Sequence, residues 1–168
     1  MDIEDCIIQL EEVFEGQPWF GPNLVDSLEK ISVGFWDKKF KNQKHSIAEL
    51  IWHMIGWRQF VIEKLKDNVS YTIEMNSEAD WRKNASVHND QDKKNLIQAL
   101  IQSQEEIIKH LDGKADSWLH EFVSGKDYKN EYMIQGLVQH DIYHLGQVNL
   151  LYSLVNQINC ERDSSVIP

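Results

Sequence analysis

The sequence predicts an all-α protein, and three observations favour that fold class. Apolar residues recur at intervals of three and four along several stretches, as the buried face of a helix requires. Start and stop signals for helices flank these stretches. No stretch sustains the alternating pattern of a β-strand, although residues 69–73 are β-prone and can be extended locally. Because four main helices have wide apolar faces to bury, we expect a four-helix bundle.

The amino-terminal part of the chain predicts one helix of this bundle and one short extra helix. Residues 3–14 carry a helical pattern of apolar side chains, and Gly16-Gln17-Pro18 ends that helix. Gly21-Pro22-Asn23 then starts a short helix that continues through Leu24, Leu28 and Ile31.

The second main helix is predicted to begin at Ser46, because Ser46 and Glu49 have the spacing of a capping box. In this arrangement the serine hydroxyl accepts a hydrogen bond from an early backbone N–H, and the glutamate reaches back to the backbone of the serine. The buried stripe of this helix consists of Ile47, Leu50, Ile51, Met54, Ile55, Val61, Ile62 and Leu65.

Two further helices complete the predicted bundle. The third main helix runs from about Asp92 to Leu111 and stops at Asp112-Gly113, and the last one spans roughly residues 128–157. The loop of residues 68–90 is long for a connection within a bundle, and long structured loops often cover a functional site. We therefore expect this loop to act as a cap or a crossover.

Length, composition and charge bound the class of protein. A chain of 168 residues fits one domain, expected over residues 1–160 with a polar tail at 161–168. We expect a soluble, cytoplasmic protein, because no long apolar window predicts a membrane span and no segment resembles a signal peptide. The net charge of −10 disfavours nucleic acid as a partner, since a negative surface repels phosphates. Cys6 and Cys160 are expected to be reduced thiols.

A pair of histidines in the last helix carries the functional prediction. His140 and His144 are four residues apart, so their rings lie about one turn apart on one face and can share a metal ion. The helical wheel places both at the margin of the apolar stripe. The pair is weak evidence by itself, because two buried histidines can instead donate hydrogen bonds to backbone carbonyls or carboxylates.

His53, in the second main helix, is the best candidate for a third ligand. It shares a seam with Leu50, Trp57 and Phe60 beside the main apolar stripe, where a single histidine is more often a core residue with satisfied hydrogen bonds. Three imidazoles from two helices leave the remaining metal positions open for water or substrate. That openness is typical of a catalytic metal site rather than a structural one.

Gln147 and Asp141 are expected close to the three histidines. Gln147 returns to the ligand face and either hydrogen-bonds a water on the metal or is an ordinary polar helix position. Asp141 falls near the middle of the apolar stripe, where an unpaired carboxylate is costly. Its partner is either a ligand imidazole or Arg58, and we favour Arg58 because both residues occupy core-facing positions. The remaining histidines are expected to be structural or exposed: His45, His88, His110 and His120.

Three motifs make the sequence resemble the DinB-like superfamily of metal-dependent enzymes over nearly its whole length. They are HDIYHLGQ at residues 140–147, HSIAELIWH at residues 45–53 and GQPWFGP at residues 16–22. The resemblance implies an up-down-down-up four-helix bundle, often a homodimer, whose His53, His140 and His144 bind nickel, zinc or a similar ion. It also implies a pocket walled by aromatic residues, and the candidates, each of which is otherwise a core residue, are Trp19, Trp52, Trp57 and Trp81.

The resemblance leaves two reactions open. Some relatives resemble S-transferases that use low-molecular-weight thiols such as bacillithiol, mycothiol or glutathione, and others are called hydrolases. We therefore expect a metal-dependent enzyme in which the ion activates a water or a thiol for attack on a small molecule. The alternative is a non-catalytic metal- or ligand-binding bundle, such as a sensor or stress protein.

Overall fold

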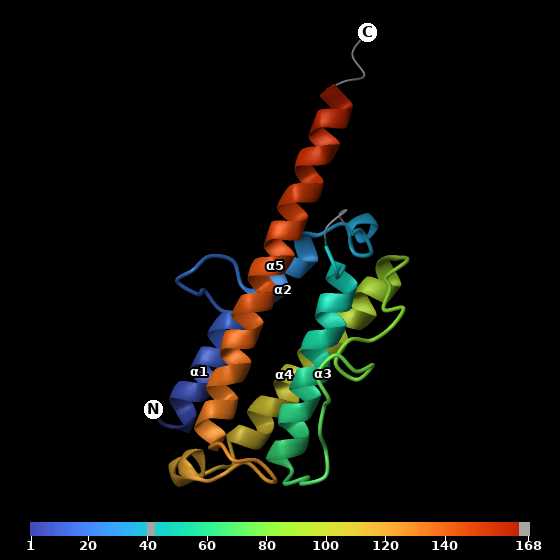
Figure 1. The fold of residues 1–168 in the computed structure, drawn as a ribbon. Coiled ribbons are helices and arrows are strands. Elements are labelled where there is room, and N and C mark those ends of the chain that lie inside the picture. The colour runs from blue at the N-terminus through green and yellow to red at the C-terminus, as the bar shows by residue number, and fades with distance from the viewer. Residues whose placement is uncertain (40–42, 165–168) are drawn as a thin grey trace.

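The structure is a computed structural model that describes residues 1–39 and 43–164, except for the side chains of Val155 and residues 157–164. This part of the chain contains five α-helices and two 3-10 helices (Figure 1). The α-helices are α1 (Ile3–Phe14), α2 (Leu24–Lys30), α3 (Ile47–Leu65), α4 (Asp90–Leu111) and α5 (Asn130–Ser164). The 3-10 helices are η1 (Val33–Phe35) and η2 (Asp116–His120). The described residues form no β-strand, so the predicted all-α class is confirmed.

Polar side chains mark where the first four α-helices begin. Asp2, Asn23, Ser46 and Asn89 each accept a hydrogen bond from a backbone N–H in the first turn of the helix that follows. Glu49 also accepts from the backbone N–H of Ser46, which confirms the predicted capping box. These side chains satisfy backbone donors that have no partner within the helix.

Two helix boundaries differ from the sequence prediction. α4 begins at Asp90 rather than at about Asp92, because Asn89 supplies the cap. α5 begins at Asn130 and continues to Ser164, beyond the predicted end at Gln157. Residues 148–164 contain neither glycine nor proline, so this stretch has no strong helix breaker. Of the predicted tail, residues 161–164 belong to α5 and residues 165–168 lie outside the described residues.

Two apolar clusters form the core between the long helices. α3 packs against α4 and α5, and α1 packs against α5 and α4. Figure 1 shows α1 beside α5, and it shows the carboxyl-terminal part of α5 extending beyond the other helices. The up-down-down-up order of the four long helices stays a prediction. None of the described helices is both long and apolar enough to cross a membrane.

A buried ion pair joins α3 to α5. The guanidinium of Arg58 donates a hydrogen bond to Oδ2 of Asp141 and another, of 2.8 Å, to Oε1 of Gln104 on α4. The predicted pairing of Asp141 with Arg58 is therefore present. Burial raises the pKa of Asp141, whereas the adjacent charge of Arg58 lowers it. The core tolerates the two charges because each is in contact with its counter-charge.

Removing one member of this pair is expected to destabilise the protein strongly. Asp141→Asn should lower the free energy of unfolding by about 3–5 kcal/mol, because the guanidinium of Arg58 stays buried without a counter-charge. The double variant Arg58→Met, Asp141→Leu should be more stable than Asp141→Asn, and urea unfolding followed by circular dichroism measures both. A double variant that is no more stable than Asp141→Asn would contradict a direct coupling between the two side chains.

Candidate metal centre

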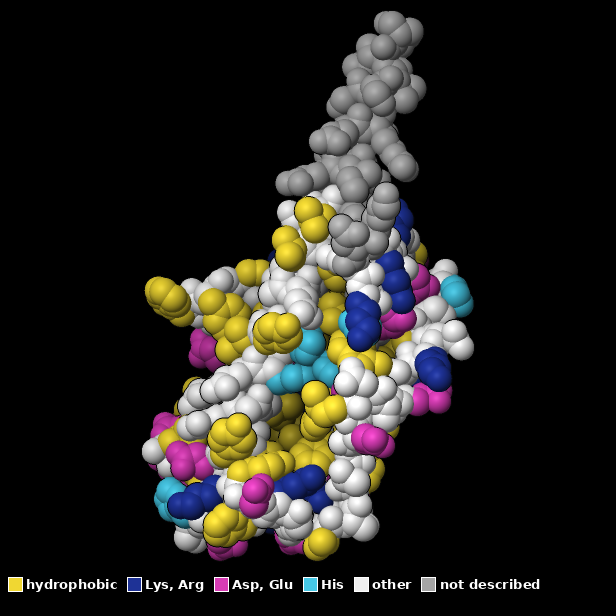
Figure 2. Space-filling model, viewed as in Figure 1, with side chains coloured by type: hydrophobic (Ala, Val, Ile, Leu, Met, Phe, Trp, Pro, Cys, Tyr) yellow, Lys and Arg dark blue, Asp and Glu magenta, His cyan; other side chains and the backbone are white. Residues whose placement is uncertain are grey.

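Three histidine side chains meet between α3 and α5. His53 comes from α3, whereas His140 and His144 come from successive turns of α5. Their candidate ligand atoms all lie within 4.8 Å of one another, and Nε2 of His53 lies 3.0 Å from Nε2 of His140. His53 and His144 are buried, and His140 is half-buried. Figure 2 shows a group of histidine side chains (cyan) in a hollow at the centre of one face, with hydrophobic side chains below it.

Asp80, in the loop between α3 and α4, holds the ring of His53. Nδ1 of His53 lies 2.9 Å from the backbone oxygen of Asp80 and 3.0 Å from its Oδ1. Both of these atoms are acceptors, so Nδ1 carries the proton and Nε2 keeps its lone pair. Asp80 is itself buried, and it accepts hydrogen bonds from Nε1 of Trp57 (2.9 Å) and the backbone N–H of Asn76 (2.7 Å).

A glycine lets this loop approach the helix. Gly56 follows His53 by almost one turn of α3, and a Cβ at this position would lie 3.1 Å from the backbone oxygen of Ala79. A larger residue would therefore push the loop, and Asp80 with it, away from His53. The sequence prediction missed Asp80, because no spacing rule relates a loop residue to a helix that precedes it. The available signal was the length of the loop, which indicated a cover over a site.

Gln147 orients the second histidine. Its Oε1 lies 2.7 Å from Nδ1 of His144, three residues earlier on α5. Since an amide oxygen only accepts, Nδ1 of His144 carries the proton and Nε2 is left as the ligand atom. Gln147 therefore lies on the ligand face as predicted, but its oxygen is engaged by a histidine and not directed to a water on the metal.

The position of His140, the third histidine, fits a cation that it shares with His53. Two imidazole lone pairs 3.0 Å apart, on Nε2 of His53 and of His140, repel each other unless a proton or a cation lies between them. Nitrogens that share a tetrahedral zinc ion at about 2.0–2.1 Å lie about 3.4 Å apart, which is close to this separation. Nδ1 of His140 is buried with no hydrogen-bond partner among the described residues, so this ring lacks the second contact that orients the other two.

Burial keeps two of these histidines neutral. Burial, together with nearby positive charge such as that of Arg58, lowers the pKa of His140 to about 3. Burial also lowers the pKa of His144 to about 4, although the hydrogen bond to Gln147 opposes this effect. Both rings are therefore neutral at pH 7, which is the state in which imidazole binds a metal ion.

Two of the predicted tryptophans pack against the histidines. Trp81 stacks on His53 with 3.9 Å between ring centroids, and it also stacks on His45 at 3.5 Å. Trp57 stands edge-on to His53 and His140, at 6.5 and 6.3 Å. His45, expected to be structural or exposed, thus packs beside the site through Trp81. These aromatic contacts restrict rotation of the His53 ring and cover part of the site.

The other two predicted tryptophans lie elsewhere. Trp52 directly precedes His53, so its side chain points about 100° away around the helix, where the guanidinium of Arg82 lies 4.0 Å from its ring centroid. Trp19 is fully exposed on the loop between α1 and α2. Its ring is not seen in contact with the three histidines among the described residues, and a place for Trp19 in the pocket wall stays a prediction.

The two lowered pKa values predict a loss of stability in mild acid. In the unfolded chain His140 and His144 take up protons near pH 6.5, whereas in the folded protein they stay neutral until about pH 3 and 4. Because the unfolded state binds more protons in this window, the free energy of unfolding of the metal-free protein should fall as the pH drops from 6.5 towards 4. Urea unfolding of His140→Gln should show a shallower fall than the wild type, and equal slopes would contradict the lowered pKa.

Comparison with known proteins agrees with the motifs. The family model described as the DinB superfamily matches residues 21–148, which include all three histidines, Asp80 and Gln147. No curated protein and no solved structure matches the chain. The family match covers well over half of the 168 residues. The chain therefore belongs to the DinB superfamily.

Proposed function

We propose that this protein is a metal-dependent enzyme in which His53, His140 and His144 hold one divalent ion, nickel or zinc. The enzyme uses a water or a low-molecular-weight thiol as the nucleophile, for hydrolysis of a small molecule or for S-transfer to it. The observation that carries the proposal is the contact between the Nε2 atoms of His53 and His140, together with the hydrogen bonds that hold the protons of His53 and His144 on Nδ1.

The donor set supports a catalytic metal. Imidazole nitrogens suit zinc and nickel, and the three side chains leave further positions of a tetrahedral or larger coordination shell open. An ion bound in this way supplies Lewis acidity, which makes water or a thiol nucleophilic near neutral pH and polarises a carbonyl group. The DinB superfamily assignment and the cluster of three histidines both support this use of the site.

The side chains around the histidines have positioning roles in this proposal. Asp80 and Gln147 keep protons on the Nδ1 atoms of His53 and His144, which leaves both Nε2 atoms free to bind. Trp57 and Trp81 shield the rings from water on their side of the site. The histidines thus form a fixed polar surface beside apolar walls. Such walls exclude bulk water, which would otherwise compete with the bound nucleophile.

Among the side chains that the structure describes, no activated thiol lies near this site. Burial raises the pKa of the Cys6 thiol to about 11, and Cys6 lies in α1, within the apolar cluster that α1 shares with α3 and α5. The side chain of Cys160 lies outside the described residues. The nucleophile is therefore proposed to be a small molecule, either water or a thiol co-substrate.

We also propose the order of the helices in the bundle, the oligomeric state and the kind of partner. The up-down-down-up order is supported by Figure 1, in which α1 and α5 rise in the view while α3 and α4 descend. A homodimer is supported by the apolar side chains of Tyr143 and Leu150, which are exposed on α5. The net charge of −10 supports a small-molecule substrate and not a nucleic acid, and a cytoplasmic location is proposed as the sequence predicts.

The hydrogen bond from His53 to Asp80 should raise the affinity for the metal. Asp80→Asn is expected to weaken zinc binding by about 10–100-fold, because the negative charge beside Nδ1 of His53 is lost, although the backbone oxygen of residue 80 still accepts its proton. Competition with a chromophoric chelator measures the affinity. Glu78→Gln removes an exposed carboxylate from the same loop and should bind zinc as the wild type does. Equal affinity of Asp80→Asn and the wild type would contradict the role of Asp80.

The proposed function is tested by turnover of the metal-loaded protein. With nickel or zinc bound, the protein is expected either to consume a small thiol in the presence of an aryl halide or to hydrolyse activated esters without a thiol. His144→Ala should bind no ion and should lose this turnover, because two imidazoles hold a divalent ion far less tightly than three.

His120→Ala is the matched control, because this exposed histidine of η2 lies away from the three ligands, and the variant should keep both metal and activity. Unchanged metal content in His144→Ala would refute the metal site. If the wild type binds one ion per chain but turns over nothing across a broad panel, the catalytic proposal fails. The protein would then be a non-catalytic metal-binding bundle.

A further inference from the structure

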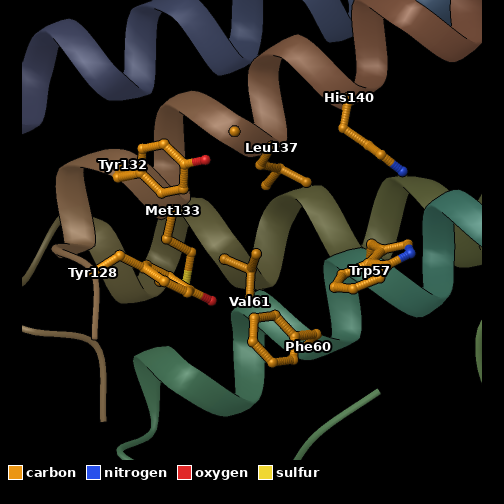
Figure 3. Close-up of a pocket in the computed structure, with 9 residues that line it drawn as sticks. Trp57, Phe60, Val61, Tyr128, Tyr132, Met133, Leu137 and His140 are labelled. Carbon is orange, nitrogen blue, oxygen red and sulfur yellow. The ribbon is translucent and has the colours of Figure 1, made fainter. Parts of the chain in front are cut away.

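A cavity of about 180 Å³ lies between α3 and α5 and ends at one of the three histidines. Figure 3 shows His140 and Trp57 at one end and Tyr128 and Tyr132 at the other, with Val61, Phe60 and Leu137 between them. Nε2 of His140 is directed to His53, so the cavity lies beside the imidazole of His140 and next to the candidate metal centre.

A missing side chain creates this cavity. Tyr132, Gly136 and His140 are four residues apart on α5, so they lie on one face of the helix and span about 12 Å. The middle position has no side chain, and apart from the neighbouring residues and backbone of α5 itself, no atom lies within 4 Å of where its Cβ would be. Glycine within a helix is less favourable than alanine. The space opposite α3 is therefore left open at a position where a larger residue would also form a better helix.

The size and lining of the cavity favour an aromatic occupant. A dry apolar cavity of about 150 Å³ in another protein is known to bind benzene, and this cavity is slightly larger. Four of its walls are aromatic rings, from Trp57, Phe60, Tyr128 and Tyr132, which pack well against the edge or face of another ring. The ammonium groups of Lys64 and Lys126 lie 5.6 and 5.5 Å from the centroid of Phe60, and their charge disfavours a cationic ligand.

We propose that the substrate carries an uncharged aromatic group of about the size of benzene, held in this cavity, with its reacting group beside the three histidines. The proposal rests on the function proposed above, because it names the substrate class of that site. Gly136 is then a specificity-determining residue, since its lack of a side chain provides the room for the ring.

Two hydroxamates test the proposal on the zinc-loaded protein. Benzohydroxamate and acetohydroxamate carry the same metal-binding group, but only the first carries a phenyl ring. Calorimetry is expected to show benzohydroxamate binding at least about tenfold more tightly, because the cavity buries its ring. Gly136→Leu should remove most of this advantage and leave acetohydroxamate binding unchanged. Gly146→Leu, the same change at another open helical position of α5, should keep the advantage.

Equal affinity for the two hydroxamates, or an advantage that survives in Gly136→Leu, would overturn the proposal. If neither compound binds, the zinc ion has no coordination position open to a ligand, and toluene binding to the zinc-free protein then decides the cavity. Nuclear magnetic resonance is expected to show toluene bound to the wild type and to Gly146→Leu but not to Gly136→Leu. Absence of toluene binding to the wild type would overturn the aromatic site.

Discussion

The buried contact between Arg58 and Asp141 sets the register of α3 against α5, and the histidine site depends on that register. His53 lies little more than one turn before Arg58, and His140 directly precedes Asp141. When the guanidinium meets the carboxylate, the two Nε2 atoms therefore come to 3.0 Å from each other. A slip of one turn between the helices would move the histidines about 5.4 Å apart and would break the ion pair as well. Burying Arg58 and Asp141 costs desolvation free energy, but the same ion pair positions the histidines that are proposed to bind the metal.

The loop between α3 and α4 holds the ring of His53 in place. Its Asp80 fixes the tautomer of His53, and Trp81 stacks on the same ring. Because Gly56 has no side chain, the loop can lie close enough to α3 to make both contacts. On the other helix, Gln147 has the corresponding role for His144. The two histidines are therefore held through their Nδ1 atoms by different parts of the chain, and both direct Nε2 towards the space shared with His140.

Residues within helices could be predicted from the sequence because helical periodicity is a local rule. The cap at Ser46, the shared face of His140 and His144, and the pairing of Asp141 with Arg58 all follow from spacing and from the cost of an unpaired buried charge. The end of α5 at Ser164 did not follow, because the helix continues where no breaking residue stops it and no cap signal marks its end. Spacing therefore predicts which face a residue occupies better than where a helix stops.

Contacts made by loops could not be predicted in this way. The role of Asp80 depends on how the chain folds back over α3, and the exposure of Trp19 depends on where the loop before α2 leads. The aromatic cavity is an intermediate case, since the spacing of Tyr132, Gly136 and His140 is visible in the sequence but the facing residues of α3 are not assigned by it. Side chains on one helix face could be grouped from the sequence, whereas their partners on other segments required the structure.

The proposed function requires that three imidazoles from α3 and α5 bind one ion. Anomalous X-ray diffraction from crystals of the metal-loaded protein, recorded on both sides of the zinc or nickel absorption edge, tests it most directly. We expect a single strong peak at about 2.0–2.1 Å from the Nε2 atoms of His53, His140 and His144, with at least one coordination position free of protein ligands. A peak held by other residues, or the absence of any peak between these rings, would contradict it.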